Sequence, residues 1–216
     1  MSQSNLNPVQ DMATNGQIEN IFSTPLFSHV LQNVDALNAE LRDLILERER
    51  TTPSAAKSNI GGWQSEADFL TWGGSAVTTL GRYLVTAVEI ATARLPLVAP
   101  KLNIRFELVA WAAVNRTGHY NASHVHPTAT WSGVYYVDPG DRPQHGAGAV
   151  LEFEHPVQAM VMNFFPGLVP SSLVVRPEAG LVVLFPSSLV HHVRIYQGER
   201  PRICVPFNAR PQIDRS

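Results

Sequence analysis

The chain has 216 residues, of which 44% are hydrophobic and 16% are charged. These values supply enough apolar side chains for a packed core and exclude a chain that is disordered throughout. The formal net charge is -2, and no long block of lysine and arginine occurs. The sequence therefore lacks the electrostatic footprint of a protein that binds nucleic acid or a membrane surface.

Cysteine content and the N-terminus indicate the compartment. A single cysteine, Cys204, excludes an internal disulfide framework and fits a reducing compartment. Residues 1–20 lack the positive and apolar regions of a signal peptide, and no apolar run approaches the ~20 residues that span a bilayer. We expect a cytoplasmic protein with a mobile segment over residues 1–18 and a single domain over residues 19–216.

The first half of the chain predicts one strand and two helices. Residues 21–33 form an apolar segment broken by proline, which is typical of an edge strand. Residues 34–50 carry leucines and isoleucine at helical spacing, with acidic residues early and arginines late. Residues 51–65 have the composition of a loop. Residues 76–95 predict a second amphipathic helix, which Pro96 ends.

After Pro100 the sequence changes character. Short runs rich in β-branched and aromatic residues alternate with glycine- and proline-containing turns, a pattern that indicates a sandwich or barrel. We therefore predict a mainly β protein, a barrel or jelly roll with the N-terminal helices packed on it. The predicted strand regions are residues 104–115, 130–137, 148–154, 173–176, 180–185, 189–196 and 202–208.

Histidines concentrate in this β-rich part, where seven of the eight occur between residues 119 and 192. His124 and His126 are two residues apart, so on a strand they would face one point. Of the adjacent pair His191 and His192, at most one can face the barrel interior. Two histidines from one strand and a third from a later strand would bind a metal and leave its opposite face open. Single histidines beside apolar strands are more often structural, so the surrounding sequence must decide.

The segment that follows His191 supplies that context. Gly180 opens a strand, Pro186 ends it, and His191 begins the next strand. Arg202 stands at the start of the last strand and shares one side with Cys204. An arginine that points into a barrel is costly unless it is paired with an anion.

Four stretches together resemble the Fe(II)/2-oxoglutarate-dependent oxygenases, most closely their uncharacterised bacterial and phage branch. They are "GGWQS" (61–65), "HVHP" to "SGVYYV" (124–137), "LFPSSLVHHV" (184–193) and "RICVPFN" (202–208). The resemblance covers most of the chain from about residue 20 and is strongest from residue 115. It implies a double-stranded β-helix, a jelly roll that holds Fe(II) in its interior.

The resemblance also implies a ligand set. The family pattern is H-x-D/E, then a distal histidine followed by x-Val, then an arginine about ten residues later. His124 matches the first position, His191 with Val193 matches the distal one, and Arg202 matches the arginine that holds the far carboxylate of 2-oxoglutarate. His126 stands where the family has a carboxylate. It is either the third metal ligand or a supporting group, which would leave His124 and His191 with water or an added anion.

By this resemblance the protein is a dioxygenase that hydroxylates an unknown small-molecule or peptide substrate and releases succinate and CO₂. Asn115, Tyr120 and Asn208 are candidate cosubstrate contacts, with turn or edge positions as the alternative. Glu152 and Glu154 alternate with apolar residues and are expected on the solvated face of a strand. Either could supply a carboxylate to the metal if His126 does not bind.

Two other functions remain open. A cupin-type dioxygenase or isomerase without 2-oxoglutarate fits the spacing from Gly118 to His124 and from Gly180 to Pro186. The glutamate of that pattern is missing, however, and a cupin gives Arg202 no role. A non-catalytic barrel that binds zinc is the second alternative. The substrate and the oligomeric state, with a homodimer as one option, are not readable from the sequence.

Overall fold

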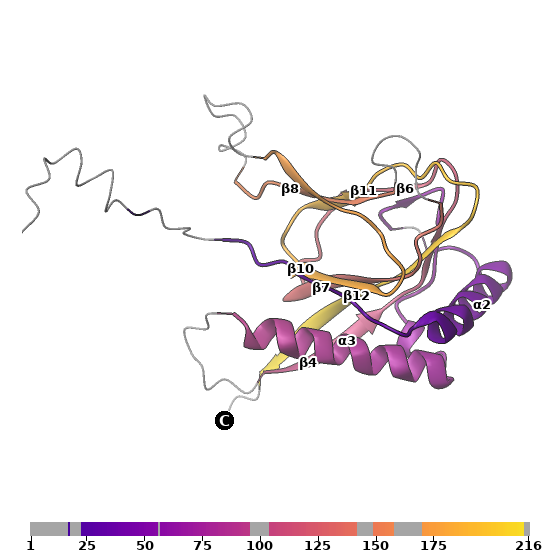
Figure 1. Ribbon diagram of the computed structural model, residues 1–216, viewed down its shortest axis with the longest axis horizontal. Helices are drawn as coiled ribbons and strands as arrows, with labels where there is room; N and C mark the ends of the chain where they lie inside the picture. Colours follow the sequence, from indigo (N-terminus) through magenta and orange to yellow (C-terminus); the bar gives the residue numbers. More distant parts are fainter. Residues whose placement is uncertain are drawn as a thin grey trace, which may run out of the picture.

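A computed structural model describes Gln17 and residues 23–55, 57–95, 104–141, 149–157 and 170–213. Two antiparallel sheets face each other, and two helices cover the outer side of one of them (Figure 1). This arrangement confirms the predicted jelly roll with N-terminal helices. Apart from Gln17, the segment expected to be mobile (1–18) lies outside the described residues, so that expectation stays a prediction.

The larger sheet lies against the helices. Its edge strand β1 falls within residues 21–33, which confirms the edge strand predicted there. The long last strand β12 pairs with β7, β5 and β4 and thereby joins the C-terminal end of the chain to the centre of the sheet. In sheet order the strands are β1 (Phe27–Val30), β10 (Leu181–Pro186), β7 (Trp131–Asp138), β12 (Arg202–Ile213), β5 (Ala113–Asn115) and β3 (Trp63–Gln64), with β4 (Ile104–Ala110) beside β12.

The smaller sheet closes the other side of the jelly roll. One of its strands, β2, lies within residues 51–65, where we expected a loop, and so does β3 of the larger sheet. The loop prediction is therefore wrong at these positions. Each is only two residues long, too short for an alternating pattern to be recognised. In order, the strands are β2 (Asn59–Ile60), β6 (Tyr120–His124), β11 (His191–Val193), β8 (Leu151–Glu154) and β9 (Ser172–Val175).

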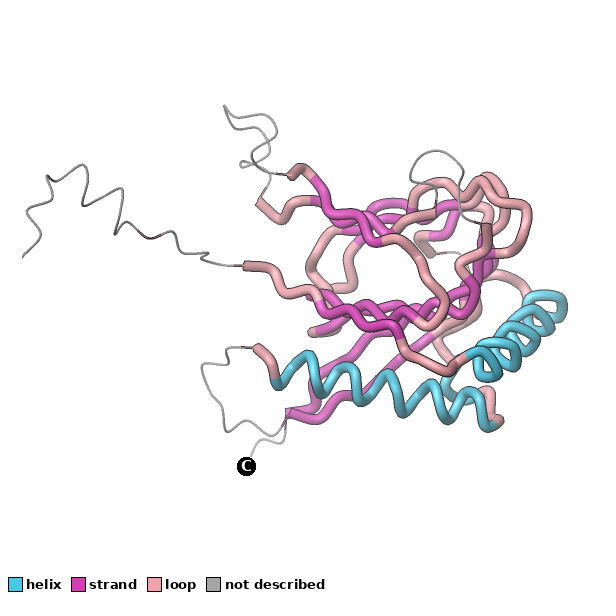
Figure 2. Tube along the Cα trace, viewed as in Figure 1, coloured by secondary structure: helices cyan, strands magenta, loops and turns pink. Residues whose placement is uncertain are grey.

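Both predicted helices are present, α2 over Asp35–Thr51 and α3 over Ser75–Ala93, preceded by a short 3-10 turn at Phe69–Thr71 (Figure 2). Their apolar faces are buried against the larger sheet, as the helical spacing predicted. Tyr135 of β7 donates a buried hydrogen bond to Asn38 Oδ1 of α2, 2.6 Å away. Within the described residues, neither helix is long and apolar enough to cross a membrane.

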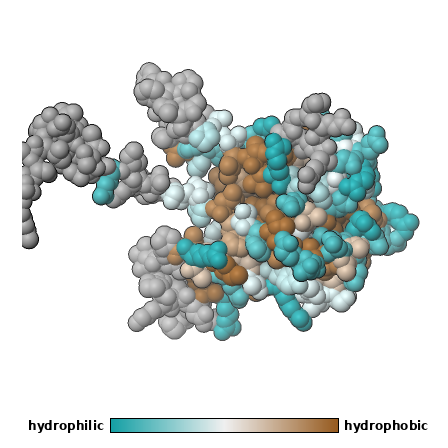
Figure 3. All heavy atoms as spheres, in the orientation of Figure 1, coloured by the Kyte–Doolittle hydropathy of each residue, from teal (hydrophilic) through white to brown (hydrophobic). Residues whose placement is uncertain are grey.

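Strand alternation divides the apolar residues between two cores. On β7, Trp131 and Tyr135 face the helix side, whereas Val134 and Tyr136 face the space between the sheets. Apolar residues gather in the middle of the face shown in Figure 3, over the space between the sheets. Where β7 packs beside β12, only a glycine fits at position 133, because a Cβ there would lie 2.5 Å from a ring carbon of Phe207.

Candidate active site

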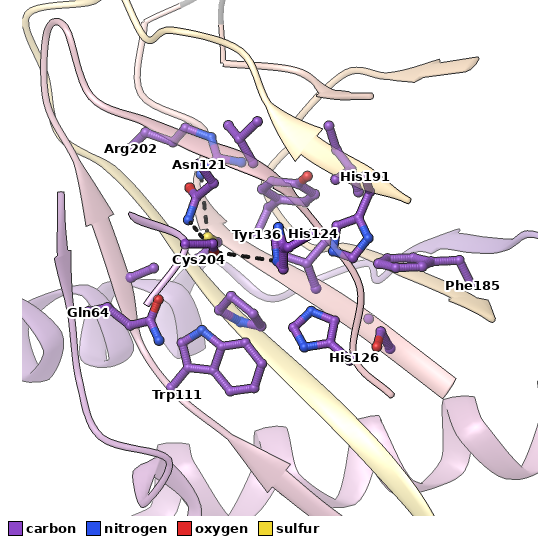
Figure 4. A pocket seen from close by; sticks show the side chains of 18 residues that line it. Gln64, Trp111, Asn121, His124, His126, Tyr136, Phe185, His191, Arg202 and Cys204 are labelled. Carbon is purple, nitrogen blue, oxygen red and sulfur yellow. Dashed lines mark hydrogen bonds between the residues drawn. The ribbon is translucent and has the colours of Figure 1, made fainter. Parts of the chain in front are cut away.

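A cavity of about 560 Å³, which includes open solvent, lies between the two sheets. The three histidines of the predicted cluster line it together with Arg202 and Cys204 (Figure 4). The histidines come from the smaller sheet and its following turn, whereas Arg202 and Cys204 come from β12 of the larger sheet. The jelly-roll closure therefore brings together groups that are up to 80 residues apart in the sequence, from His124 to Cys204.

His124, His126 and His191 each offer one ring nitrogen, and these nitrogens all lie within 4.8 Å of one another. His191 and His124 are direct partners in the β11–β6 ladder, and their ring centroids are 4.3 Å apart. His126 lies just beyond the end of β6, where its backbone N–H donates to Ser187 O at 2.9 Å. The three side chains converge as predicted, although only His124 of the H-x-H pair belongs to the strand.

Hydrogen bonds set the tautomers of two of these histidines. His124 Nδ1 lies 2.7 Å from Ala122 O, and His191 Nδ1 lies 2.8 Å from Leu189 O. A carbonyl oxygen only accepts, so each Nδ1 carries the proton and each Nε2 keeps a lone pair. Ser58 Oγ lies 3.4 Å from His124 Nε2 and can donate to it. Both Nε2 atoms are thus prepared to bind a metal ion.

Burial keeps these rings neutral. Loss of water contact lowers the pKa of His124, lowers that of His126 to about 4, and lowers that of His191 to about 3. The values for His126 and His191 include a smaller contribution from the neighbouring imidazoles. Neutral imidazole is the form that binds Fe(II), zinc or copper. The donor set therefore fits a transition metal ion.

His126 is held differently. Its Nδ1 lies 3.4 Å from the side-chain nitrogen of Asn208, and the side-chain oxygen of Asn208 accepts a 2.8 Å hydrogen bond from Ser132. The indole of Trp111 covers the other side, with its ring centroid 5.8 Å from that of His126. Asn208 does not line the cavity in the described part of the chain, so the structure places it behind His126.

The other two predicted cosubstrate contacts also lie outside the cavity lining. Asn115 is the ladder partner of Arg202 and is buried, with no hydrogen-bond partner for its side-chain nitrogen among the described residues. Tyr120 pairs with Ile60 at the β2–β6 edge and is half-buried. Contact of Asn115, Tyr120 or Asn208 with a cosubstrate stays a prediction.

Arg202 is a buried cation without an acidic partner. It is 2% exposed, and it forms no ion pair within the described residues. One guanidinium nitrogen donates to Cys204 Sγ at 3.4 Å, and Arg202 Cζ lies 5.2 Å from the ring centroid of Tyr136. In the described part of the chain, Arg202 Nε and the Tyr136 hydroxyl lack hydrogen-bond partners.

The neighbours of Arg202 do not neutralise it. Burial raises the pKa of the Cys204 thiol and raises that of Tyr136 to about 12, so both keep their protons at neutral pH. The guanidinium itself stays charged. A buried, uncompensated positive charge with unused donors indicates a site for an anion.

Two cavity residues, Gln64 and Tyr136, were not found from the sequence. Gln64 lies in the region taken as a loop; it is 7% exposed, and no hydrogen bond of its side chain is found among the described residues. Tyr136 was read only as a strand residue. Strand alternation could have placed Tyr136 on the same side as Val134, but the cross-strand register that sets it opposite Cys204 is not in the sequence.

The burial of Glu152 differs from what the sequence predicted. It was expected on a solvated face, but it is only 6% exposed. Its carboxylate accepts hydrogen bonds from Arg194 at 2.5 and 2.8 Å and from Ser172 at 2.5 Å, and it lies 3.0 Å from His192 Nε2. Neither Glu152 nor His192 lines the cavity, so this acid is not placed to bind the metal. His191 alone of the adjacent pair faces inward, as predicted.

Comparison with protein families gives one match. Residues 109–208 match the model described as "Putative 2OG-Fe(II) oxygenase", a stretch that contains the three histidines and Arg202. This match confirms the predicted resemblance to the Fe(II)/2-oxoglutarate-dependent oxygenases. It also confirms the predicted enzyme class, an oxidoreductase that depends on iron and 2-oxoglutarate. No curated protein sequence matches the chain.

Solved structures share the fold at low identity. A Pseudomonas putida prolyl-4-hydroxylase is 18% identical, with 94% of this chain and 96% of that chain covered and a TM-score of 0.62. HygX from Streptomyces hygroscopicus, solved with nickel and 2-oxoglutarate bound, is 12% identical, with 88% and 84% covered and a TM-score of 0.60. A Trichoplax adhaerens prolyl hydroxylase in complex with a hypoxia inducible factor peptide is 13% identical, with 94% and 86% covered and a TM-score of 0.57. These structures support the jelly-roll fold of this chain.

Proposed function

We propose that this 2OG-Fe(II) oxygenase holds Fe(II) through Nε2 of His124, His126 and His191 and holds the far carboxylate of 2-oxoglutarate at Arg202. The observation that carries the proposal is the shared cavity: a neutral three-histidine cluster and an uncompensated buried arginine line the same space. Three histidines alone also suit a structural zinc ion, and a buried arginine alone also suits an unrelated anion. Together they match a cosubstrate that carries a metal-chelating end and an anionic end.

Bound iron supplies the oxygen chemistry: one atom of O₂ enters succinate as 2-oxoglutarate loses CO₂, and the other enters the substrate as a hydroxyl group. The chain's own residues position and shield the reactants. Arg202 offers its unused Nε–H, and Tyr136 offers a hydroxyl that stays protonated, so both donate to the carboxylate. Phe185 and Leu151 supply apolar walls that exclude water from the cavity.

The three-histidine set changes the charge of the site. A carboxylate at position 126 would cancel one positive charge of the metal, whereas neutral imidazole cancels none. We therefore expect weaker retention of Fe(II) than at a site with one carboxylate, and stronger competition from zinc and copper. A cupin-type enzyme without 2-oxoglutarate accounts for the histidines but leaves the charge of Arg202 unexplained.

We infer that the substrate enters beside Trp111 and Gln64, which line the same cavity and lie below Arg202 in the view of Figure 4. Among the described lining residues there is no aspartate, glutamate or lysine. We infer that the part of the substrate that reaches the metal is uncharged, with an apolar face for the indole and a hydrogen-bonding group for the Gln64 amide. A small molecule or a peptide can meet these requirements. The free, buried Cys204 agrees with a cytoplasmic location.

An anaerobic titration of metal-free protein with Fe(II), with and without 2-oxoglutarate, tests the proposal. We expect a weak visible charge-transfer band that requires both components. His191→Ala should abolish iron binding, and Arg202→Met should keep iron but lose the effect of 2-oxoglutarate. Arg82→Met is the control, because Arg82 is an exposed arginine on α3 that does not line the cavity. Iron binding without any 2-oxoglutarate effect would favour the cupin-type function, and binding of zinc alone would favour a non-catalytic barrel.

A further inference from the structure

The three histidines differ in what faces their Nδ1 atoms. For His124 and His191 the neighbour is a backbone carbonyl, which can only accept a hydrogen bond. For His126 the neighbour is the side-chain amide of Asn208, whose nitrogen lies 3.4 Å from Nδ1. An amide nitrogen only donates, so in this arrangement His126 Nδ1 accepts and its proton resides on Nε2.

That tautomer cannot bind a metal through Nε2. With Nδ1 facing Asn208, Nε2 is the nitrogen left to join the other two ligand atoms, and it needs a free lone pair. His126 therefore has to move its proton to Nδ1 before it becomes the third ligand. Asn208 must then present an acceptor to Nδ1 in place of a donor.

Asn208 can make that change without losing a hydrogen bond. Its second partner is the Ser132 hydroxyl, which donates to the side-chain oxygen at 2.8 Å. A half turn of the amide places the oxygen against His126 Nδ1 and the nitrogen against Ser132, whose oxygen can also accept. Ser132 and Asn208 are direct ladder partners on β7 and β12, so both orientations keep the same two neighbours.

We propose that Asn208 is a positioning residue that controls whether His126 binds the metal. In one orientation of its amide the protein has two prepared histidine ligands, and in the other it has three. Each orientation keeps two hydrogen bonds, and metal binding selects the second one. This inference rests on the three-histidine site proposed above. It explains how a histidine at position 126 can serve as a metal ligand where the family pattern has a carboxylate.

Metal affinity in two opposite variants provides the first test. Asn208→Asp presents oxygen at both ends and fixes the proton on His126 Nδ1, so we expect tighter Zn(II) binding by about tenfold. Asn208→Leu removes both hydrogen bonds at similar size, so we expect binding weaker by about tenfold. Affinities would be measured by competition with a chromophoric chelator. Gln32→Glu, at an exposed position in the loop after β1, is the control for an added negative charge.

Histidine ¹⁵N NMR provides the second test and reports the tautomer directly. In metal-free protein we expect His126 with its proton on Nε2, unlike His124 and His191. With Zn(II), a diamagnetic substitute for Fe(II), all three should carry the proton on Nδ1. In Asn208→Asp, His126 should already carry it there without metal. An unchanged His126 tautomer on Zn(II) binding would overturn the proposal.

The outcomes separate this inference from the function it rests on. If His126→Ala leaves Zn(II) affinity unchanged, His126 is no ligand, and both the three-histidine site and the role of Asn208 fall. If His126→Ala weakens binding but Asn208→Asp and Asn208→Leu weaken it equally, Asn208 is only structural and the three-histidine site stands. Opposite effects of the two Asn208 variants, with equal melting temperatures, support the inference.

Discussion

Two arginines, Arg194 outside the cavity and Arg202 inside it, have contrasting surroundings. Arg194 lies outside the cavity and meets the carboxylate of Glu152 through two hydrogen bonds. Arg202 lies inside, is nearly fully buried, and meets a thiol and an aromatic ring instead of an acid. Arg194 is paired with an acid in a cluster that joins strands of the fold, whereas Arg202 has no acidic partner within the described residues, and we propose that a ligand supplies it.

The contrast separates structural charge from functional charge. The Glu152 cluster joins β8, β9 and β11, because its members Ser172, His192 and Arg194 come from those strands or directly follow them. It therefore holds the strand that carries His191. From this contrast we assign the paired Glu152 charge to the fold and propose that the unpaired Arg202 charge serves binding.

Loss of the Arg202 charge should have the largest effect. Arg202→Met is expected to weaken 2-oxoglutarate binding by about 100-fold or more, because a charge-assisted bond to a buried carboxylate contributes about 3 kcal/mol. Calorimetric titration of the Zn(II)-loaded protein would measure it. Since the wild-type charge has no partner, we expect the variant to unfold at an equal or higher temperature. A large loss of stability would mean that Arg202 is structural.

Loss of the Glu152 carboxylate should lower stability and leave the affinity for 2-oxoglutarate unchanged, the reverse of what we expect for Arg202. Glu152→Gln is expected to lower the free energy of unfolding by about 2 kcal/mol, because Arg194 and His192 lose their common anion. Urea unfolding would measure the change. The affinity for 2-oxoglutarate should stay near that of the wild type. A selective loss of cosubstrate affinity at unchanged stability would contradict the assignment of this cluster to the fold.

Removal of one hydroxyl offers a finer test. Tyr136→Phe is expected to weaken 2-oxoglutarate binding by about 1 kcal/mol, since one hydrogen bond to the carboxylate is lost. The same change removes a buried hydroxyl that has no partner in the described part of the chain, so stability should be unchanged or slightly higher. Thermal melting and calorimetric titration of the same samples would show whether affinity and stability separate.

The stability that the Glu152 cluster contributes should depend on pH in the acidic range. The Arg194 guanidinium, together with a hydrogen bond from Ser172 and the nearby His192, lowers the pKa of Glu152 to about 2 from an ordinary value of 4.5. A lowered native pKa means that the unfolded chain binds the proton more readily, so this stabilisation is present above pH 4.5 and is lost as the pH falls towards 2. Urea unfolding between those pH values should therefore show a smaller decline for Glu152→Gln than for the wild type.

The sequence predicted the parts of the site that depend on short-range rules. The spacing of His124 and His126, the choice of His191 and the shared side of Arg202 and Cys204 follow from strand alternation and the family pattern, and the cavity contains all five. These rules do not give the register between distant strands.

Register and length account for what was missed. Tyr136 stands opposite Cys204 only because β7 and β12 pair in one register, with a shift between Ile203 and Cys204. Gln64 belongs to a strand of two residues inside a loop-like segment, which leaves no periodic signal. The burial of Glu152 depends on three partners that come from elsewhere in the sequence.

One strand carries both ends of the site. On β12, Arg202, Cys204 and Pro206 line the cavity and Asn208 supports His126, whereas the residues between them face the helices. Six steps at ~3.3 Å per residue set about 20 Å from the first to the last. An inserted residue in this stretch would turn one end towards the helices, since each step reverses the side. The length of this stretch is therefore constrained more tightly than the identity of its residues.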